Sequence, residues 1–320
     1  MKVNFKGTLL ASIVFGTLLL GGCDSLLVLD PKGPQAEVQA NDTMMLIFMM
    51  SGIVLAVFAM LIFMLVKYRA SKQSPDYEPP HIHGHWLVET ICIGIPIIIV
   101  IFLGVRSIGS NYLVESAPDA YKEEEPLVIY ASSSDWKWHF SYPEQGIETV
   151  NYLYIPANRN IEFKLYSYGP ITSFWIPQLG GQKYAMADMV TTLHLAADEV
   201  GEYWGRNANF AGAGTAEQTF DVTALTQDEF DEWVDEVKDT AEPLTEQKFE
   251  ELLEPGHLGR STYTGTHLEF SPAPEHNHGS SDSDTMDHEN MDMENMDHEN
   301  MDQNEHGNHQ DTEHEDHSSH

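Results

Sequence analysis

The residues best suited to chemistry in this 320-residue chain gather near its end, where histidine, methionine and acidic side chains alternate. A five-residue unit that begins at Met286 recurs from Met291 and again from Met296. Thioethers suit Cu(I), whereas imidazoles and carboxylates suit Cu(II), zinc or nickel. The tail residues that we expect to bind such ions are His288, Met291, Met293, Met296 and His298. The alternative is a solvated acidic tail with no role for metal.

A second candidate is Glu89, which stands near the start of an apolar run from Trp86 to about Ile108. An ionisable side chain in a membrane segment is costly, which makes Glu89 a candidate for a functional role. The alternative is an interfacial carboxylate that reaches the lipid headgroups. Three histidines precede it, His81, His83 and His85, and we interpret them as part of a solvated loop or, alternatively, as proton collectors.

The chain has two cysteines, too few for a disulfide framework. Cys92 lies in an apolar run and is expected to be a small buried hydrophobe. Cys23 follows Leu-Gly-Gly at the end of a short apolar stretch that two lysines precede, the pattern of a bacterial lipoprotein signal peptide. The alternatives are an ordinary signal peptide or an uncleaved helix, but the residue order favours lipidation. Palmitate-like acyl chains on Cys23 would anchor the mature N-terminus to the membrane.

The charge of the chain limits its partners. A formal net charge of -34 argues against nucleic acid, because phosphate binding needs a basic face. Much of this charge lies between Glu275 and His320, which hold 15 acidic residues and no lysine or arginine. That segment lacks aromatic and β-branched apolar residues, so nothing offsets the entropy cost of ordering it, and it is expected to be disordered.

Two apolar runs are long enough to cross a bilayer, Met44–Val66 and Trp86 to about Ile108. Each holds about 23 residues, roughly 34 Å as a helix. Asn41, Asp42 and Thr43 supply residues typical of a helix start before the first run. The sequence therefore predicts a two-helix transmembrane hairpin.

The orientation of this hairpin follows from its flanking charges. The short connection holds Lys67, Arg69 and Lys72, whereas the segment before the first run holds Lys32 alone. The positive-inside rule therefore places the connection in the cytoplasm and both termini outside. A lipid on Cys23 requires the same orientation.

The chain beyond the hairpin changes to a period of two from Glu125 to about Thr223. Ile161, Phe163 and Leu165 alternate with more polar residues, and glycine, proline and asparagine separate several such short runs. This pattern predicts a β-sandwich or barrel of about 100 residues. Two short helices are expected after it, one capped by Thr226 and Glu229 and one over Thr245–Leu253. Their apolar stripes are interpreted as packing on the β domain rather than binding a cofactor.

The expected organisation has six parts. They are a lipoprotein signal peptide (1–22), an outer N-terminal segment (23–42), the transmembrane hairpin (43–110, with helices at about 44–66 and 86–108), the β domain (125–224), a helical C-terminal extension (225–273) and the disordered acidic tail (274–320).

Several local motifs carry a family resemblance. They are Ser134–Trp138, Tyr142–Ile147, Ser173–Pro177 and Tyr184–Met186. In this order, behind a lipoprotein signal and a two-helix hairpin, they resemble subunit II of haem–copper oxidases, over about residues 24–270. The lysine between two tryptophans and the Pro-Glu-Gln-Gly run are similar to the quinol-oxidase branch. The resemblance implies that the outer domain is an all-β, cupredoxin-like sandwich.

The resemblance also identifies where a dinuclear copper centre would be bound. In the copper-bearing branch, cysteine, glutamate, histidine and methionine ligands occupy a set of positions that here hold other residues. Those positions are Thr172, Asn207, Asn209, Ala211, Thr215 and Gln218. Because copper of that type needs thiolates and imidazoles, we expect no such centre. His139 and His194 remain in the domain, as structural residues or, alternatively, as ligands of a mononuclear copper.

The function implied by the resemblance is that of subunit II in a proton-pumping quinol oxidase of a bacterial cell membrane. Haems and copper would belong to subunit I, and this chain would bind no cofactor. It would brace subunit I and contact other small membrane subunits and lipid, while quinol would reach the complex through the membrane. Glu89 would lie at the mouth of a proton-uptake path. The alternative is a surface metal-binding lipoprotein that uses the tail.

Overall fold

The computed structural model describes residues 26–69 and 84–274. Several predictions therefore lie outside the described residues. These are the signal peptide and the lipidation of Cys23, the connecting loop with His81 and His83, and the disorder and metal ligands of the tail.

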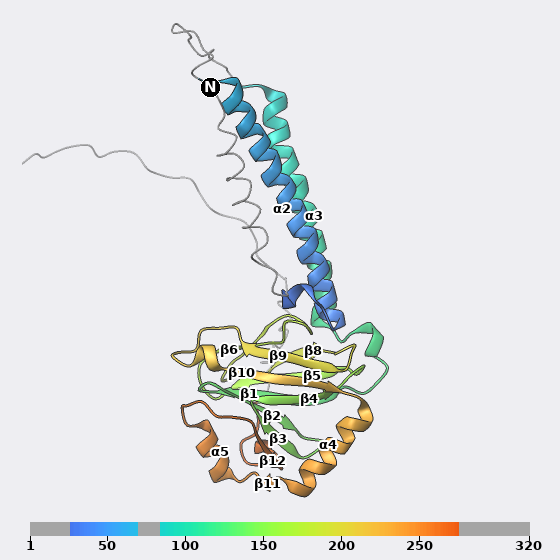
Figure 1. The fold of residues 1–320 in the computed structure, drawn as a ribbon, viewed down its shortest axis with the longest axis vertical. Helices are drawn as coiled ribbons and strands as arrows, with labels where there is room; N and C mark the ends of the chain where they lie inside the picture. The colour runs from blue at the N-terminus through green and yellow to red at the C-terminus, as the bar shows by residue number, and fades with distance from the viewer. Residues whose placement is uncertain (1–25, 70–83, 275–320) are drawn as a thin grey trace, which may run out of the picture. The chain divides into compact units, whose positions relative to one another are not determined.

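Two long helices form an antiparallel pair, α2 (Pro34–Lys67) and α3 (Trp86–Glu115), which run side by side (Figure 1). Each contains an 18-residue stretch of high mean hydropathy, 2.8 in α2 and 2.6 in the span that begins with α3, and each is long enough to cross a membrane. Cys92, expected to be buried, is instead exposed on α3, because no other described helix covers that face.

The first helix begins earlier than the sequence pattern indicated. Gly33 is its N-cap and Pro34 its first residue, a position where the missing N–H of proline costs nothing. The expected start at Asn41–Thr43 was wrong, since those residues lie inside α2. Residues 34–43 are polar enough to lie outside the apolar run, and Gln35, Ala36 and Ala40 are buried. A short 3-10 turn, η1 (Leu27–Leu29), precedes the helix.

The chain then forms a sandwich of two mixed sheets. The first ten strands are β1 (Leu127–Ser134), β2 (Lys137–Tyr142), β3 (Ile147–Val150), β4 (Tyr152–Pro156), β5 (Ile161–Ser167), β6 (Thr172–Trp175), β7 (Lys183–Ala185), β8 (Thr191–Leu195), β9 (Gly201–Asn207) and β10 (Thr219–Leu225). One sheet has seven strands in the order β11-β12-β3-β2-β1-β5-β8, in which β11 (Glu242–Pro243) and β12 (Ser261–Thr264) come from the C-terminal extension. The other has five strands in the order β4-β10-β9-β6-β7. Strands β1 and β5 pair in parallel, as do β4 and β10.

The core lies between these sheets and follows the period of two. On β5, Ile161, Phe163 and Leu165 have no exposed surface, whereas Glu162 and Lys164 between them are half-buried. Aromatic rings from both sheets meet in the centre, with Trp138 and Phe174 at a centroid distance of 5.2 Å. The expected all-β sandwich behind a two-helix transmembrane hairpin is confirmed.

The C-terminal extension contains α4 (Gln227–Thr240), β11 (Glu242–Pro243), α5 (Glu246–Leu253), β12 (Ser261–Thr264) and the turn η5 (His267–Glu269). The predicted capping box is present, because the Thr226 hydroxyl accepts from Glu229 N and the Glu229 carboxylate accepts from Thr226 N. Phe230 on α4 and Phe249 on α5 are both at most 2% exposed. The apolar stripes therefore pack on the sandwich, as predicted.

The extension also buries a face that the sequence pattern assigns to solvent. Residues on β2 that alternate with the core, Lys137, His139 and Ser141, are at most 3% exposed. The Lys137 ammonium donates to the carbonyl oxygens of Glu254 and Gly256, so that it closes the loop after α5 over the strand. Figure 1 shows α5 and β12 on the far side of β2 and β3 from the five-stranded sheet.

Candidate functional site

The residues at which the family resemblance leads us to expect vacated copper positions gather at one end of the sandwich, around the loop from β9 to β10. Asn207 ends β9, and Gln218 immediately precedes β10. The Asn207 side-chain amide donates to Gln218 Oε1 at 2.8 Å, and both side chains are 1% exposed. The two ends of the loop are therefore held together by a carboxamide pair.

This pair is saturated with further hydrogen bonds. Asn207 Oδ1 accepts from the backbone N–H of Ser173 at 2.8 Å and of Asn209 at 2.9 Å. Gln218 Nε2 donates to the carbonyl oxygens of Ser134 and Lys137, both at 3.3 Å. Every donor and acceptor of the pair thus has a partner, as buried polar groups require.

The tip of the loop is held in the same way. The Thr215 hydroxyl accepts from Ala211 N at 2.8 Å and donates to Gly212 O at 2.7 Å. The Trp136 indole donates to Ala211 O at 3.0 Å and lies against Gly214, where a Cβ would approach the ring within 2.3 Å. Gly214 therefore permits the tryptophan to cover the loop.

The last of these residues, Thr172, lies at the start of β6 and is fully buried. Its hydroxyl is 2.7 Å from the Ser133 hydroxyl, which in turn donates to Ser167 Oγ at 3.1 Å. The Asn209 side chain donates to Ile171 O beside it at 2.8 Å. All six residues are therefore brought into one connected region.

The donor set of this region does not fit a dinuclear copper centre. Its side chains are amides and hydroxyls that already bond one another, whereas such a centre needs soft thiolates and imidazoles. Within residues 26–69 and 84–274, no three His, Cys, Asp or Glu side chains form a group that could hold a metal.

The two remaining histidines of the domain do not come together. His139 lies on β2, with Nε2 2.9 Å from Ser134 Oγ, whereas His194 lies three strands away on β8, beside Asn160. Burial, with the nearby charges of His267 and Lys137, lowers the pKa of His139 to about 3. Burial also lowers the pKa of His194. In both rings burial thus disfavours the protonated form, and the structural role expected for these histidines stays a prediction.

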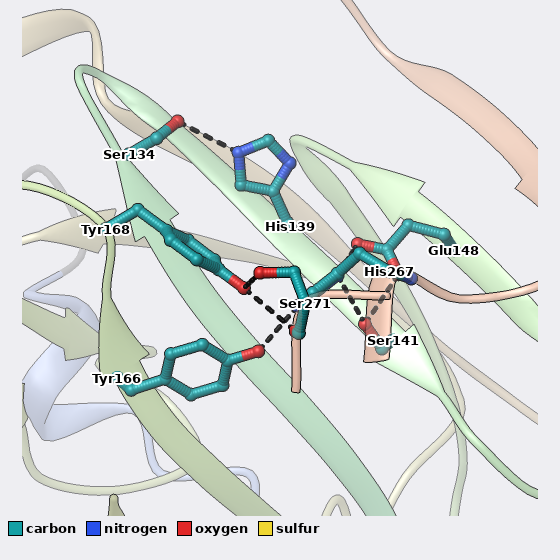
Figure 2. Close-up of polar contacts among 8 residues, drawn as sticks. All are labelled: Ser134, His139, Ser141, Glu148, Tyr166, Tyr168, His267 and Ser271. Carbon is teal, nitrogen blue, oxygen red and sulfur yellow. Dashed lines mark hydrogen bonds and ion pairs between the residues drawn. The ribbon is translucent and has the colours of Figure 1, made fainter. Parts of the chain in front are cut away.

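A second polar cluster, which the sequence did not reveal, lies on the face of the seven-stranded sheet that points away from the core between the sheets (Figure 2). The Glu148 carboxylate on β3 accepts from the Ser141 hydroxyl at 2.5 Å and from His267 Nδ1 at 2.6 Å. The Tyr166 hydroxyl lies 2.5 Å from the other ring nitrogen, Nε2. Phe249 of α5 stacks on the imidazole at 4.4 Å. We name Ser141, Glu148, Tyr166 and His267 the buried cluster.

The buried cluster has the residue types of a hydrolase triad but not its arrangement. In a triad, serine and the acid bond opposite nitrogens of the histidine. Here Ser141 and Glu148 both face Nδ1, Ser141 lying 3.0 Å from it, and the serine hydroxyl is donated to the carboxylate. None of the four residues is more than 1% exposed. The cluster therefore joins the C-terminal segment to the sheet and presents no nucleophile to a substrate.

Glu89 lies in the first turn of α3 and is exposed. Its carboxylate bends back over the preceding turn, since a Cβ on Gly84 would lie 2.1 Å from Glu89 Oε1. A carboxylate in this position is favoured by the positive end of the helix dipole. His85 is the N-cap residue of the same helix. The arrangement leaves an accessible acidic group at the end of the hairpin away from the sandwich.

Comparison with known proteins gives consistent matches. The family model described as cytochrome c oxidase subunit II, transmembrane domain, matches residues 29–109. The quinol oxidase subunit 2 of Bacillus subtilis (strain 168) is 48% identical over 267 residues, which cover 83% of both chains. That of Bacillus cereus (strain ATCC 10987) is 46% identical over 264 residues, covering 82% of this chain and 91% of the relative.

A relative from another genus gives a similar result. The probable quinol oxidase subunit 2 of Staphylococcus saprophyticus is 45% identical over 269 residues, covering 83% of this chain and 70% of the relative. Among solved structures, the periplasmic domain of subunit II of cytochrome oxidase from Bradyrhizobium japonicum matches 36% of this chain and 96% of its own, with 21% identity and a TM-score of 0.35.

Proposed function

The chain belongs to the quinol oxidase subunit 2 family, and we propose that within its oxidase it is the subunit without a redox centre of its own. The observation that carries this proposal is the amide and hydroxyl network of Asn207, Gln218 and Thr215, at the positions of copper ligands in related subunits. The sandwich would then act as a scaffold over subunit I rather than as an electron carrier.

The source of electrons follows from the lack of a copper centre in this subunit. Cytochrome c is water-soluble and needs an electron-accepting centre that is exposed outside the bilayer. Quinol is dissolved in the membrane and can meet the catalytic subunit there. Subunit I would carry the haems and copper, reduce O₂ to water and pump protons. The hairpin of α2 and α3 would brace subunit I and the other small subunits, because its apolar surface is largely exposed in this chain alone.

The test of this proposal is an assay of the purified complex. We expect the complex to oxidise a quinol and to leave reduced cytochrome c unchanged, with haem in a co-purifying subunit. Oxidation of cytochrome c, or a dinuclear copper signal in the electron paramagnetic spectrum of this subunit, would contradict it. A blue mononuclear signal that disappears in His139→Phe would revive the alternative copper site.

Glu89 is proposed as a proton-entry residue for subunit I. Its support is the accessible carboxylate in the first turn of α3, at the end of the hairpin where the positive-inside rule puts the cytoplasm. Glu89→Gln should slow quinol oxidation about tenfold. This is less than the ~10²-fold that a proton-transferring group typically contributes when it is essential to the reaction itself. Glu115→Gln, at the other end of the same helix, is the matched control. Equal turnover in both variants, with normal haem content, would remove the proposal.

The membrane anchorage has a further proposed part. Lipidation of Cys23 and an outward β domain are consistent with the hairpin, whose connection carries the basic residues. Metabolic labelling with palmitate should mark the wild type and leave Cys23→Ser unlabelled. Protease added to intact protoplasts should cleave the C-terminal extension and spare the connection between α2 and α3.

The tail supports a second, lesser role in weak metal binding. Its candidates are His288, Met291, Met293, Met296 and His298, which lie outside the described residues. Equilibrium dialysis of a tail peptide against Cu²⁺ tests this, with a peptide of scrambled Asp and Ser as the control. A free-standing metal-binding lipoprotein is not favoured, because that reading explains neither the membrane hairpin nor the relatives.

A further inference from the structure

A groove of about 440 Å³ lies between α2 and α3, in the halves of the two helices nearest the sandwich. We name it the hairpin groove. Gln39, Ser110 and Asn111 form part of its polar wall, and Met45 and Leu103 belong to its apolar wall. A volume of this size is typical of a small-molecule or headgroup site between helices.

The position of the groove along the helices matches a membrane surface. Asp42 lies two residues before the apolar run that begins at Met44, and Arg106 lies two residues before the end of the second run at Ile108. Its polar residues lie beyond these points, whereas Met45 and Leu103 lie within the runs. The groove thus changes from polar to apolar along the same direction in which a lipid molecule changes from headgroup to acyl chain.

The charges inside the groove define what it can bind. Arg106 Nε donates to Asp42 Oδ1 at 2.8 Å, which links the two helices. Within the described part of the chain, the terminal guanidinium nitrogens of Arg106 and Asp42 Oδ2 have no hydrogen-bond partner besides this bond. The Ser110 hydroxyl is also inaccessible and unpartnered there. The groove therefore offers donors for an anion directly beside an acceptor for a cation.

We propose that the hairpin groove binds one phospholipid whose headgroup joins a phosphate to a primary ammonium, as in phosphatidylethanolamine. The guanidinium of Arg106 would bind the phosphate, for which its planar donors are suited. The free oxygen of Asp42 would accept from the ammonium. The apolar wall at Met45 and Leu103 would contact an acyl chain. The site requires only that the hairpin lies in the membrane and does not depend on how the oxidase receives electrons.

Charge balance selects this lipid class over two others. An anionic headgroup such as phosphatidylglycerol would place its phosphate near Arg106 but leave Asp42 without a cation. A quinol headgroup is uncharged and would leave the terminal nitrogens of Arg106 and Oδ2 of Asp42 without an ionic partner. Unpaired charge is unfavourable near the low-dielectric membrane. The ion pair therefore complements a zwitterion, with each charge opposite its counterpart.

The test uses the whole oxidase complex, delipidated in mild detergent and incubated with equal amounts of phosphatidylethanolamine, phosphatidylglycerol and phosphatidylcholine. Lipid retained after gel filtration is quantified by mass spectrometry. Arg106→Gln should weaken retention of phosphatidylethanolamine at one site about tenfold, the effect of losing a charged hydrogen bond. Asp42→Asn should exchange the preference, so that the site retains phosphatidylglycerol instead.

The matched control is Arg69→Gln, the same substitution at the opposite end of the hairpin, which should retain lipid as the wild type does. If Arg106→Gln prevents assembly, Asp42→Asn and Ser110→Ala decide the question in assembled complexes. Unchanged lipid preference in Asp42→Asn overturns the proposal. So does retention of quinol in place of phospholipid, or a structure of the complex in which another subunit fills the groove.

Discussion

The loop between β9 and β10 and the buried cluster both bury polar side chains, but with different kinds of groups. In the loop, buried polar groups are neutral amides and hydroxyls, led by Asn207 and Gln218. In the buried cluster, an acidic and a basic side chain, Glu148 and His267, meet without any exposed surface. A neutral network costs little to desolvate, whereas an ionisable pair is stable only while both partners are present. The two regions should therefore respond differently to the loss of one residue.

The largest effect is expected in the buried cluster. His267→Leu leaves the Glu148 carboxylate buried without its ring donor, and we expect the free energy of unfolding to fall by about 3–5 kcal/mol. Urea unfolding of the full-length chain in detergent, followed by tryptophan fluorescence, measures this. The double variant Glu148→Leu/His267→Leu should be less damaging than the single one. A double variant that costs the sum of both singles would show that the pair is not coupled.

A smaller loss is expected from the loop. Asn207→Leu has a similar volume but leaves Ser173 N, Asn209 N and Gln218 Oε1 without their partner. Because each buried group left unsatisfied costs free energy, we expect a loss of about 2–3 kcal/mol in the same urea experiment. Thr192→Val on β8 is the control, since it removes a half-buried hydroxyl outside the loop. A loss as large as that of His267→Leu would remove the contrast between the regions.

The pH dependence of stability should separate the regions further. His139, beside the buried cluster in Figure 2, has a pKa of about 3, so the native chain stays unprotonated where the unfolded chain, at about 6.5, binds a proton. Stability from this residue is therefore present above about pH 6.5 and falls as the pH drops toward 3, by at most about 1.4 kcal/mol per pH unit. Unfolding at about pH 6 and 5 should show a shallower slope in His139→Phe and an unchanged slope in Asn207→Leu.

The smallest effect is expected from Tyr166→Phe. This change removes one hydroxyl from His267 Nε2 and keeps the ring, and burial already raises the pKa of that hydroxyl, so no charge is lost. We expect a loss of about 1 kcal/mol, a usual value for one hydrogen bond. Tyr130→Phe on the neighbouring strand is the control. Equal losses in the two variants would mean that the Tyr166 hydroxyl adds nothing to the buried cluster.

The sequence was sufficient for features that local chemistry determines. The alternation at Ile161, Phe163 and Leu165 predicts β5, and the pair Thr226 and Glu229 predicts the start of α4, because each pattern lies within one element. The six residues of the loop region were also named from the sequence, through the family resemblance. What the sequence did not provide was their mutual hydrogen bonding, since Asn207 and Gln218 are ordinary loop residues until the strands bring them together.

The buried cluster was out of reach for a physical reason. Glu148 and His267 are separated by 119 positions, and Glu148 alternates with core residues as a solvent-facing residue does. Only the later packing of α5 and η5 over that face makes it an interior. The predicted start of α2 was wrong for a simpler reason. Pro34, at the first helical position, was a better signal of the helix start than the polar residues at 41–43.

Because His267 lies far along the chain from the strands that it covers, it is synthesised after them. Strands β1 to β10 leave the ribosome long before residue 267, so a nascent chain passes through a stage in which the cover is missing. The uncovered face then displays Ser132, His139, Ser141 and Glu148, which are groups that water can solvate. A chain that ends before residue 267 would therefore leave these polar side chains of the sheet in contact with water.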